Sequence, residues 1–361
     1  MSTSEEGIVG IDIGSAHVKV CHLTERMETE IFPVGMVASK LSEGYSRMRD
    51  IILPLLRKII ERELNRWERV HVGIVTSIEA AYPREPYLRY LREFAESYFD
   101  AKFYILHETL RPREIHTLEK WPFMSSINAL RYIATRFLTD GMLIHMNSSS
   151  TLFVPVKEGF AIPLELHYSS GVGMWGGALH RHVFNITGGG VYIFGRKTYL
   201  SPTAGSIADI LLEIDPSRAL MLLQNHNMPV KSEEAKKRAR NNLAQLLGIF
   251  EDREYRNLLH GGFFDKRNQI KIASYHIYGN FLYALFENVV KIFSEVDIDV
   301  EKAHFLVSGI GEPILEESLH LFGDKVERMS QKLSGECSII LESYGAALSL
   351  QEMLGVKDED A

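Results

Sequence analysis

Two periods of apolar residues alternate along the first 140 positions of the chain. Short apolar runs over 8–13, 70–76 and 102–106 are typical of buried strands. Apolar residues at helical spacing predict three amphipathic helices, over 48–67, 86–99 and 126–137. Strands that alternate with helices in this way indicate an α/β sheet that contains parallel strands and carries helices on its faces.

The second half of the chain begins with a strand–turn–strand unit and continues with mostly helical patterns. The apolar runs 142–146 and 151–156 flank a polar turn, and a Gly-rich, loop-like segment follows over 169–190. Further helices are predicted over 206–212, 217–223, 232–247, 271–293, 312–321 and 343–354. Short strands are predicted over 304–307 and 337–341. In the helix over 271–293 an apolar stripe predicts core packing of Tyr275, Tyr278, Phe281, Leu282, Leu285, Val289 and Phe293.

The first turn of the chain combines a carboxylate with a glycine. Asp12 ends an apolar run, and Gly14 and Ser15 turn the chain into a second strand that carries His17 and Lys19. A turn without a Cβ atom lets backbone N–H groups approach phosphate oxygens closely. A neighbouring carboxylate can hold Mg²⁺, which prefers oxygen ligands. We therefore expect a phosphate or nucleotide site here, with Asp12 as the magnesium ligand.

Composition and charge restrict the partners of the chain. The net charge of −7 over 361 residues argues against nucleic acid as the main partner. No apolar run approaches the ~20 residues of a membrane span, and the N-terminal residues do not resemble a signal peptide. The only cysteines, Cys21 and Cys337, are expected to be buried thiols in a reducing compartment. We expect a cytoplasmic protein of two domains, and the sequence is compatible with a homo-oligomer.

Three turns stand in order along the chain, at 14–15, 147–151 and 309–311. The order strand–turn–strand, strand–turn–strand and strand–GxG–helix resembles the actin-like ATPase fold, a ribonuclease H-like α/β fold found in actin, Hsp70 and sugar kinases. There, the first two turns hold phosphates from opposite sides of an inter-domain cleft, and the third lies under the adenosine. The resemblance implies ATP, ADP or another phosphate ligand with Mg²⁺. It also implies a first domain of residues 1–137 plus 343–361, and a second of 138–342.

Within that superfamily, the chain resembles the hydantoinase/oxoprolinase-related proteins over nearly its whole length. It is similar to the archaeal branch linked to tetrahydromethanopterin-dependent one-carbon metabolism and methanofuran biosynthesis. Family members begin with Gly-Xaa-Asp-Xaa-Gly-Gly-Ala-Asn-Xaa-Lys, and this chain matches that pattern except for Ser15 and His17. The other similar segments are Val75-Thr76-Ser77 with Glu79, Ser125-Ser126-Ile127-Asn128-Ala129, and Gly311-Glu312.

The second turn departs from the family pattern Val-Asp-Ile-Gly-Ser-Thr-Thr-Thr-Asp. His145 stands where the first Asp is expected, Asn147 where the Gly is, and Leu152 where the second Asp is. Neutral imidazole is a poor ligand for Mg²⁺, and the lost carboxylates would each lower the rate of phosphoryl transfer by roughly 10²–10⁴. The sequence therefore favours phosphate binding over ATP hydrolysis.

Three functions remain open at this stage. The resemblance implies a transferase that joins an aminomethylfuran phosphate or diphosphate to a phenol such as γ-glutamyltyramine. The alternatives are a non-catalytic nucleotide- or phosphate-binding subunit and an ATP-dependent kinase or amidohydrolase. Asp12 and Lys19 are the predicted catalytic residues. The predicted phosphate- or nucleotide-binding residues are Gly14, Ser15, His17, His145, Asn147, Ser148, Ser149, Ser150, Gly309, Gly311 and Glu312.

Overall fold

The fold was analysed in a computed structural model of the chain. The structure describes residues 6–14, 17–23, 27–34, 48–76, 84–120, 122, 125–148, 150–163, 173–174, 191–193, 196–198, 206–224, 232–247 and 265–356. Two compact units are present. The first comprises Met1–Leu143, Val154–Ile162 and Met329–Ala361, and the second comprises Ile144–Phe153 and Pro163–Arg328. The domain boundaries and the cleft expected from the sequence stay predictions.

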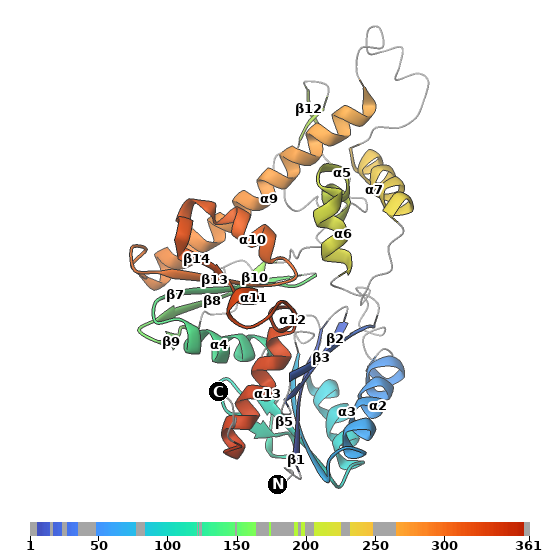
Figure 1. Cartoon of the computed structure of the whole chain (residues 1–361), viewed down its shortest axis with the longest axis vertical. Helices are drawn as coiled ribbons and strands as arrows, with labels where there is room; N and C mark the ends of the chain where they lie inside the picture. Colours follow the sequence, from blue (N-terminus) through green and yellow to red (C-terminus); the bar gives the residue numbers. More distant parts are fainter. Residues whose placement is uncertain are drawn as a thin grey trace. The chain divides into compact units, whose positions relative to one another are not determined.

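The first unit is built on a six-stranded mixed sheet in the order β3-β2-β1-β4-β5-β6 (Figure 1). Strand β1 pairs antiparallel with β2 and parallel with β4, and β4 pairs parallel with β5. The strands are β1 (Glu6–Ile13), β2 (His17–Leu23), β3 (Met27–Pro33), β4 (Arg69–Thr76), β5 (Ala101–Leu106) and β6 (Pro112–Glu114). The predicted hairpin and the predicted parallel strands are therefore confirmed.

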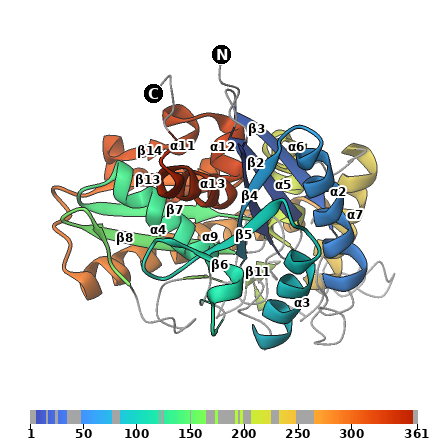
Figure 2. The same cartoon turned by 90° about the horizontal axis from the view of Figure 1, so that it is seen from below.

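Helices cover both faces of this sheet. Two helices, α2 (Leu53–Leu64) and α3 (Arg84–Glu96), pack against the face that carries Ile11, Val20 and Val72. A π-helical turn, η1 (Met48–Ile52), comes directly before α2. Helix α13 (Leu341–Leu354) packs on the opposite face against β1 and β4, and α4 (Ser125–Phe137) packs beside it. Figure 2 shows α13 and α2 on the two sides of the sheet. The remaining helices of the unit are η3 (Ile115–Thr117), α11 (Met329–Lys332) and α12 (Gly335–Ile339).

A second sheet has the strand order β10-β8-β7-β13-β14, with β9 paired to β8. Its strands are β7 (Gly141–Met146), β8 (Thr151–Lys157), β9 (Phe160–Ala161), β10 (Gly173–Met174), β13 (His304–Gly309) and β14 (Val326–Arg328). A two-stranded ribbon joins β11 (Val191–Ile193) to β12 (Arg196–Thr198). The helices of the second unit are α5 (Ile207–Ile214), α6 (Pro216–Gln224), α7 (Ser232–Leu246), α9 (Lys266–Val296), α10 (Glu312–Ser318) and η6 (His320–Lys325). Phe305 of β13 stacks on Phe293 of α9, with ring centroids 5.2 Å apart.

Two predictions about these elements are wrong. Residues 337–341 were expected as a strand, but α12 ends at Ile339 and α13 starts at Leu341, because the Ser334 hydroxyl accepts the Cys337 N–H and caps a helix. Tyr275 was expected in the core but is 55% exposed. The Gly-rich segment 169–190 lies outside the described residues apart from 173–174. Among the described helices, none has the length and apolar character needed to cross a bilayer.

Candidate functional site

The β1–β2 hairpin brings the two predicted catalytic side chains together. Asp12 and Lys19 are cross-strand partners, and the Gly14 N–H donates to the His17 carbonyl at 2.9 Å to close the turn. Because directly opposed residues point to the same face of a sheet, the two side chains meet. The Lys19 Nζ lies 3.8 Å from the Asp12 Oδ2.

A third charged residue, Glu342, joins this pair from the other end of the chain. The Lys19 Nζ donates to the Glu342 Oε2 at 3.2 Å. Glu342 lies in the first turn of α13, where a carboxylate also interacts favourably with the positive end of the helix dipole. All three side chains are buried, none being more than 4% exposed. We call Asp12, Lys19 and Glu342 the carboxylate–lysine cluster.

Glycine in β1 lets α13 come close enough to deliver Glu342. A Cβ atom on Gly10 would lie 1.9 Å from the Ser343 carbonyl oxygen, so no other residue fits there without moving the helix. A Cβ atom on Gly73 of β4 would lie 3.0 Å from the Ala346 carbonyl oxygen. The start of α13 therefore lies directly on β1, the strand that carries Asp12.

The cluster offers carboxylate oxygens to a cation. Asp12 and Glu342 both contact the Lys19 ammonium, and carboxylate oxygens are ligands that Mg²⁺ prefers. Within the described part of the chain, no group of three or more His, Cys, Asp or Glu side chains could hold a metal ion by itself. Mg²⁺ nevertheless fits, since it is usually bound by one or two carboxylates together with water and ligand phosphates. Asp12 is the residue best placed to hold it.

The end of β4 lies beside the same hairpin. The Thr76 hydroxyl donates to the Ile13 carbonyl at 2.9 Å, and the Thr76 N–H donates to the Ser125 hydroxyl at 2.9 Å. Ser125 begins α4. Two segments on which the family resemblance rests, around Thr76 and at 125–129, are thus in direct contact.

In the second unit, the second turn is organised by His145. Its Nδ1 lies 2.8 Å from the Ser308 Oγ of β13, and its Nε2 lies 3.2 Å from the Asn147 Oδ1. The Asn147 N–H donates to the Ser150 carbonyl at 2.8 Å and closes the turn. Because both ring nitrogens of His145 have polar neighbours and the ring is fully buried, the imidazole fixes the turn to β13. We call His145, Ser308 and Asn147 the imidazole network.

The third turn packs directly on the second through Met146. Gly309 has φ of 89°, and a Cβ atom there would lie 2.4 Å from the Met146 carbonyl oxygen. The Gly311 N–H donates to the same carbonyl at 3.2 Å. Both glycines are therefore required by the close approach of β7 to the turn that starts α10 at Glu312.

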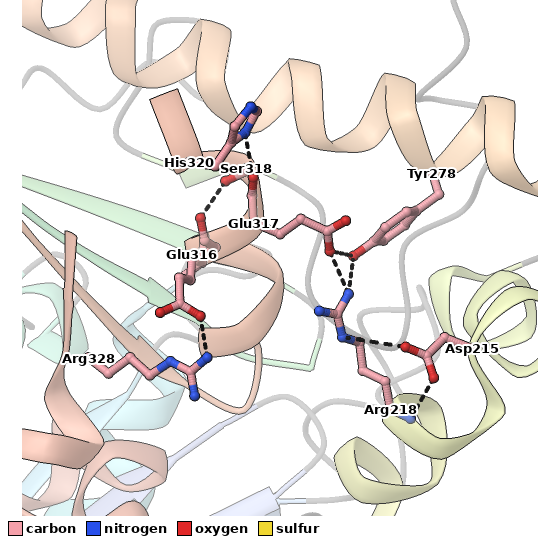
Figure 3. Close-up of polar contacts among 9 residues, drawn as sticks. Asp215, Arg218, Tyr278, Glu316, Glu317, Ser318, His320 and Arg328 are labelled. Carbon is pink, nitrogen blue, oxygen red and sulfur yellow. Dashed lines mark hydrogen bonds and ion pairs between the residues drawn. The ribbon is translucent and has the colours of Figure 1, made fainter. Parts of the chain in front are cut away.

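An ion-pair network holds the far end of α10 (Figure 3). The Arg218 guanidinium of α6 donates to Glu317 of α10 and, at 3.0 Å, to the hydroxyl of Tyr278 on α9. The Tyr278 hydroxyl also donates to the Glu317 Oε2 at 2.8 Å. Burial and the neighbouring Glu317 carboxylate raise the pKa of Tyr278 well above its usual range. Arg218 thus ties α6 and α9 to α10, the helix that follows the third turn, and we treat this network as structural support.

The predicted site residues fall into one group in each unit. Asp12, Gly14, His17 and Lys19 lie at the β1–β2 turn of the first unit. The second unit holds His145, Asn147, Ser148, Ser150, Gly309, Gly311 and Glu312. Ser15, Ser149 and Glu79 lie outside the described residues.

Sequence reasoning missed two residues of these groups, Glu342 and Ser308. Both act through contacts with residues far away in the sequence, and although Ser308 directly precedes the turn at 309–311, the turn pattern does not single it out. The one usable signal for Glu342 was the small-residue run Gly345-Ala346-Ala347 just after it, together with Gly10 in an otherwise apolar strand.

Comparison with solved structures agrees with the predicted fold. An acetone carboxylase, from work on ATP-dependent acetone carboxylation, matches with a TM-score of 0.54 and 8% identity over 94% of this chain and 70% of its own. ParM of Bacillus thuringiensis with ADP matches with a TM-score of 0.45 and 10% identity, over 97% and 100% of the two chains. The ethanolamine utilization protein EutJ from Carboxydothermus hydrogenoformans matches with a TM-score of 0.44 and 10% identity, over 95% of this chain and 89% of its own.

At such identities only the fold is comparable. No protein-family model matches the chain, and no curated protein matches it. The described sheets and helices, together with the match to the acetone carboxylase, confirm the predicted fold class: this chain has the α/β fold of the actin-like ATPases.

Proposed function

We propose that this protein binds a nucleoside di- or triphosphate, or a comparable diphosphate, together with Mg²⁺ at the β1–β2 turn. The observation that supports this function is the buried carboxylate–lysine cluster. Buried ion pairs seldom stabilise a protein more than apolar side chains of similar volume would. A cluster of buried ionisable groups beside a glycine turn is therefore better explained by ligand binding than by stability.

Each member of the cluster has a distinct role in this function. Asp12 holds the magnesium ion, which when bound neutralises phosphate charge and orients the phosphate chain. Lys19 is held between the two carboxylates and keeps their repulsion low. Glu342 fixes the Lys19 ammonium by a direct hydrogen bond and thereby positions it. A Cβ atom on Gly14 would lie 3.0 Å from the His17 carbonyl oxygen, so glycine allows the tight turn that leads from Asp12 to Lys19.

The imidazole network favours binding without rapid hydrolysis. A second-turn carboxylate of the family pattern would stand at His145, but that position holds a buried ring engaged with Ser308 and Asn147. No carboxylate of this turn is then available to orient a metal ion or water. We expect ATP turnover to be slower by roughly 10²–10⁴ than in a site that keeps this carboxylate.

Ligand titration tests the proposal directly. Isothermal titration calorimetry with ATP, ADP and diphosphate, each with and without Mg²⁺, is expected to show Mg²⁺-dependent binding. Asp12→Asn is expected to weaken binding in Mg²⁺ by at least about tenfold, because one metal ligand loses its charge. Glu63→Gln is the matched control, since Glu63 is also a buried carboxylate of the first unit and pairs with His22 and Arg62.

Two results would contradict the proposal. One is the absence of binding by every phosphate compound in a folded protein. The other is a loss in Glu63→Gln equal to that in Asp12→Asn, which would assign the effect to general destabilisation. Rapid ATP hydrolysis that disappears in Asp12→Asn would keep the binding site but overturn the argument from the imidazole network.

A transferase is the second candidate function, and the contact between Thr76 and Ser125 favours it. This contact joins two of the segments that resemble the methanofuran-related branch of the hydantoinase/oxoprolinase-like proteins. In the reaction, the phenol oxygen of the acceptor attacks the methylene carbon of an aminomethylfuran phosphate. A carbon–oxygen bond to the acceptor forms, the bond to the phosphate oxygen breaks, and the phenol proton passes to solvent. Such a reaction needs no hydrolytic carboxylate on the second turn.

Product analysis separates the candidates. Incubation with aminomethylfuran phosphate or diphosphate and γ-glutamyltyramine is expected to release phosphate or diphosphate and form an aryl ether, detected by mass spectrometry. Nucleotide binding with no ether formed would identify a non-catalytic binding subunit instead. Phosphate transfer from ATP to a small molecule would favour a kinase.

A further inference from the structure

The long helix α9 carries a second apolar stripe on the side away from its core. Its buried residues, which include Ile277, Phe281 and Leu285, contact the rest of the unit. The exposed stripe comprises Ile272, Tyr275, Gly279, Tyr283 and Val290. The side chains are 47% exposed at Ile272, 55% at Tyr275, 64% at Tyr283 and 47% at Val290. At 100° per residue, these five positions share one face that lies opposite the buried one.

This stripe is unusual for a solvated helix. Exposed apolar residues are ordinary when scattered, but here they recur over 19 residues, about 27 Å of helix, with a glycine near the centre. A Cβ atom on Gly279 would meet nothing within 4 Å, so the surface above it is open. A glycine in the middle of a helix lowers helix stability by about 1 kcal/mol, and close packing against another helix would compensate for that loss.

The order of residues in the stripe is self-complementary. Ile272 and Val290 lie equally far before and after Phe281, and so do Gly279 and Tyr283. If a second copy of α9 packs antiparallel with its two-fold axis at that point, each Ile272 meets a Val290. Each Tyr283 ring then lies over the Gly279 of the other copy. The exposed Glu287 faces Tyr275, whose hydroxyl can donate to the carboxylate.

We propose that α9 is the interface of a symmetric, antiparallel dimer of this chain, with Gly279 and Tyr283 at its centre. A closed two-fold dimer requires one patch to complement itself, and the stripe satisfies that condition. Small-on-large packing at the centre lets two helices approach to the 8–10 Å of ordinary helix pairs. Because the stripe alone is narrower than the roughly 800 Å² per partner of stable complexes, the dissociation constant is expected at about 10–100 µM.

Sedimentation equilibrium of the full chain tests the dimer. Between about 5 and about 500 µM protein, the average mass is expected to rise from one chain to two. Tyr283→Glu places two like charges at the centre of the interface and is expected to weaken the dimer at least about tenfold. Phe160→Glu is the control, since Phe160 of β9 is 73% exposed and lies outside α9. A monomer at every concentration, or a dimer that Tyr283→Glu leaves unchanged, overturns the proposal.

Cross-linking tests the antiparallel arrangement separately. The variant with both Ile272→Cys and Val290→Cys is expected to give a covalent dimer with a short bismaleimide. The two positions are about 27 Å apart within one helix, so the link must join two copies. The natural cysteines, Cys21 and Cys337, are buried and give a low background. Equal cross-linking of the variant with Ile272→Cys alone would mean a parallel pair and overturn the proposal.

Discussion

The two strand–turn–strand units of this chain share a layout but differ in the chemistry of their buried groups. The β1–β2 turn is built around the carboxylate–lysine cluster, in which the Lys19 ammonium lies within 4 Å of an oxygen of Asp12 and of Glu342. The β7–β8 turn is built around the imidazole network, which pairs a ring with a hydroxyl and an amide. The difference teaches that one turn is built on buried charged groups, whereas the other uses neutral polar groups to fix its own backbone.

The largest effect that distinguishes the two turns is expected from removing the lysine. Lys19→Met leaves Asp12 and Glu342 buried without the ammonium between them, and we expect a loss of about 3–5 kcal/mol in the first unit. Ser308→Ala removes one neutral partner of His145 in the second unit, with an expected loss of about 1–2 kcal/mol.

Native-state hydrogen exchange measures the opening free energy of each unit separately, through peptides of β1–β2 and of β7. Lys19→Met combined with Glu342→Gln is expected to recover part of the loss, because it removes one of the two repelling charges. Equal losses in Lys19→Met and Ser308→Ala would contradict the distinction between a charged and a neutral turn.

A smaller effect is expected from the glycines that bring each turn close to its neighbour. In Gly10→Ala the new methyl group meets the Ser343 backbone oxygen, which cannot move without α13, and we expect a loss of about 3 kcal/mol. In Gly311→Ala the methyl group meets the Met146 side chain, whose sulfur, 2.1 Å away, can move in another rotamer but whose Cβ atom, 2.7 Å away, moves only with the backbone. We expect a loss of about 2 kcal/mol there.

Thermal denaturation of the two variants checks this order. Gly335→Ala is the control, since a Cβ atom at this position in the first turn of α12 meets nothing within 4 Å. Its effect is expected to stay within about 1 kcal/mol. A larger loss in Gly311→Ala than in Gly10→Ala would mean that the second turn, and not the first, has the more rigid surroundings.

Local patterns in the sequence were enough for most elements but not for the contacts that complete the site. Helix α4 was predicted over 126–137 and begins one residue earlier, because its apolar period is strong over three turns. The run over 337–341 is too short for its period to distinguish a strand from a helix, and the capping serine decided the outcome.

The polar contacts of the two turns depend on tertiary structure. Lys19 and Glu342 are 323 positions apart, and His145 and Ser308 are 163 apart. A single sequence carries no periodicity over such separations. Asp12 and Lys19, by contrast, could be paired from the hairpin alone, since seven residues and one turn place them opposite each other.

The smallest expected effect is a loss of stability at low pH. It depends on Glu63, a buried carboxylate that faces the side of the first sheet opposite the carboxylate–lysine cluster. Burial raises the pKa of Glu63, but hydrogen bonds and charge contacts with His22 and Arg62 outweigh it and lower this pKa below its ordinary value. A carboxyl group with a lowered pKa in the folded state stabilises the protein above its unfolded pKa of about 4.3, and the contribution disappears as pH falls through the folded value. The free energy of unfolding is therefore expected to fall more steeply below about pH 4.3 in the natural protein than in Glu63→Gln.

Urea denaturation between about pH 6 and pH 3 measures this free energy of unfolding, with Glu68→Gln, at an exposed position, as the control. Parallel pH profiles of the natural protein and Glu63→Gln would show that the His22 and Arg62 contacts do not stabilise the charged carboxylate, and that buried charge in this unit matters only at the β1–β2 turn.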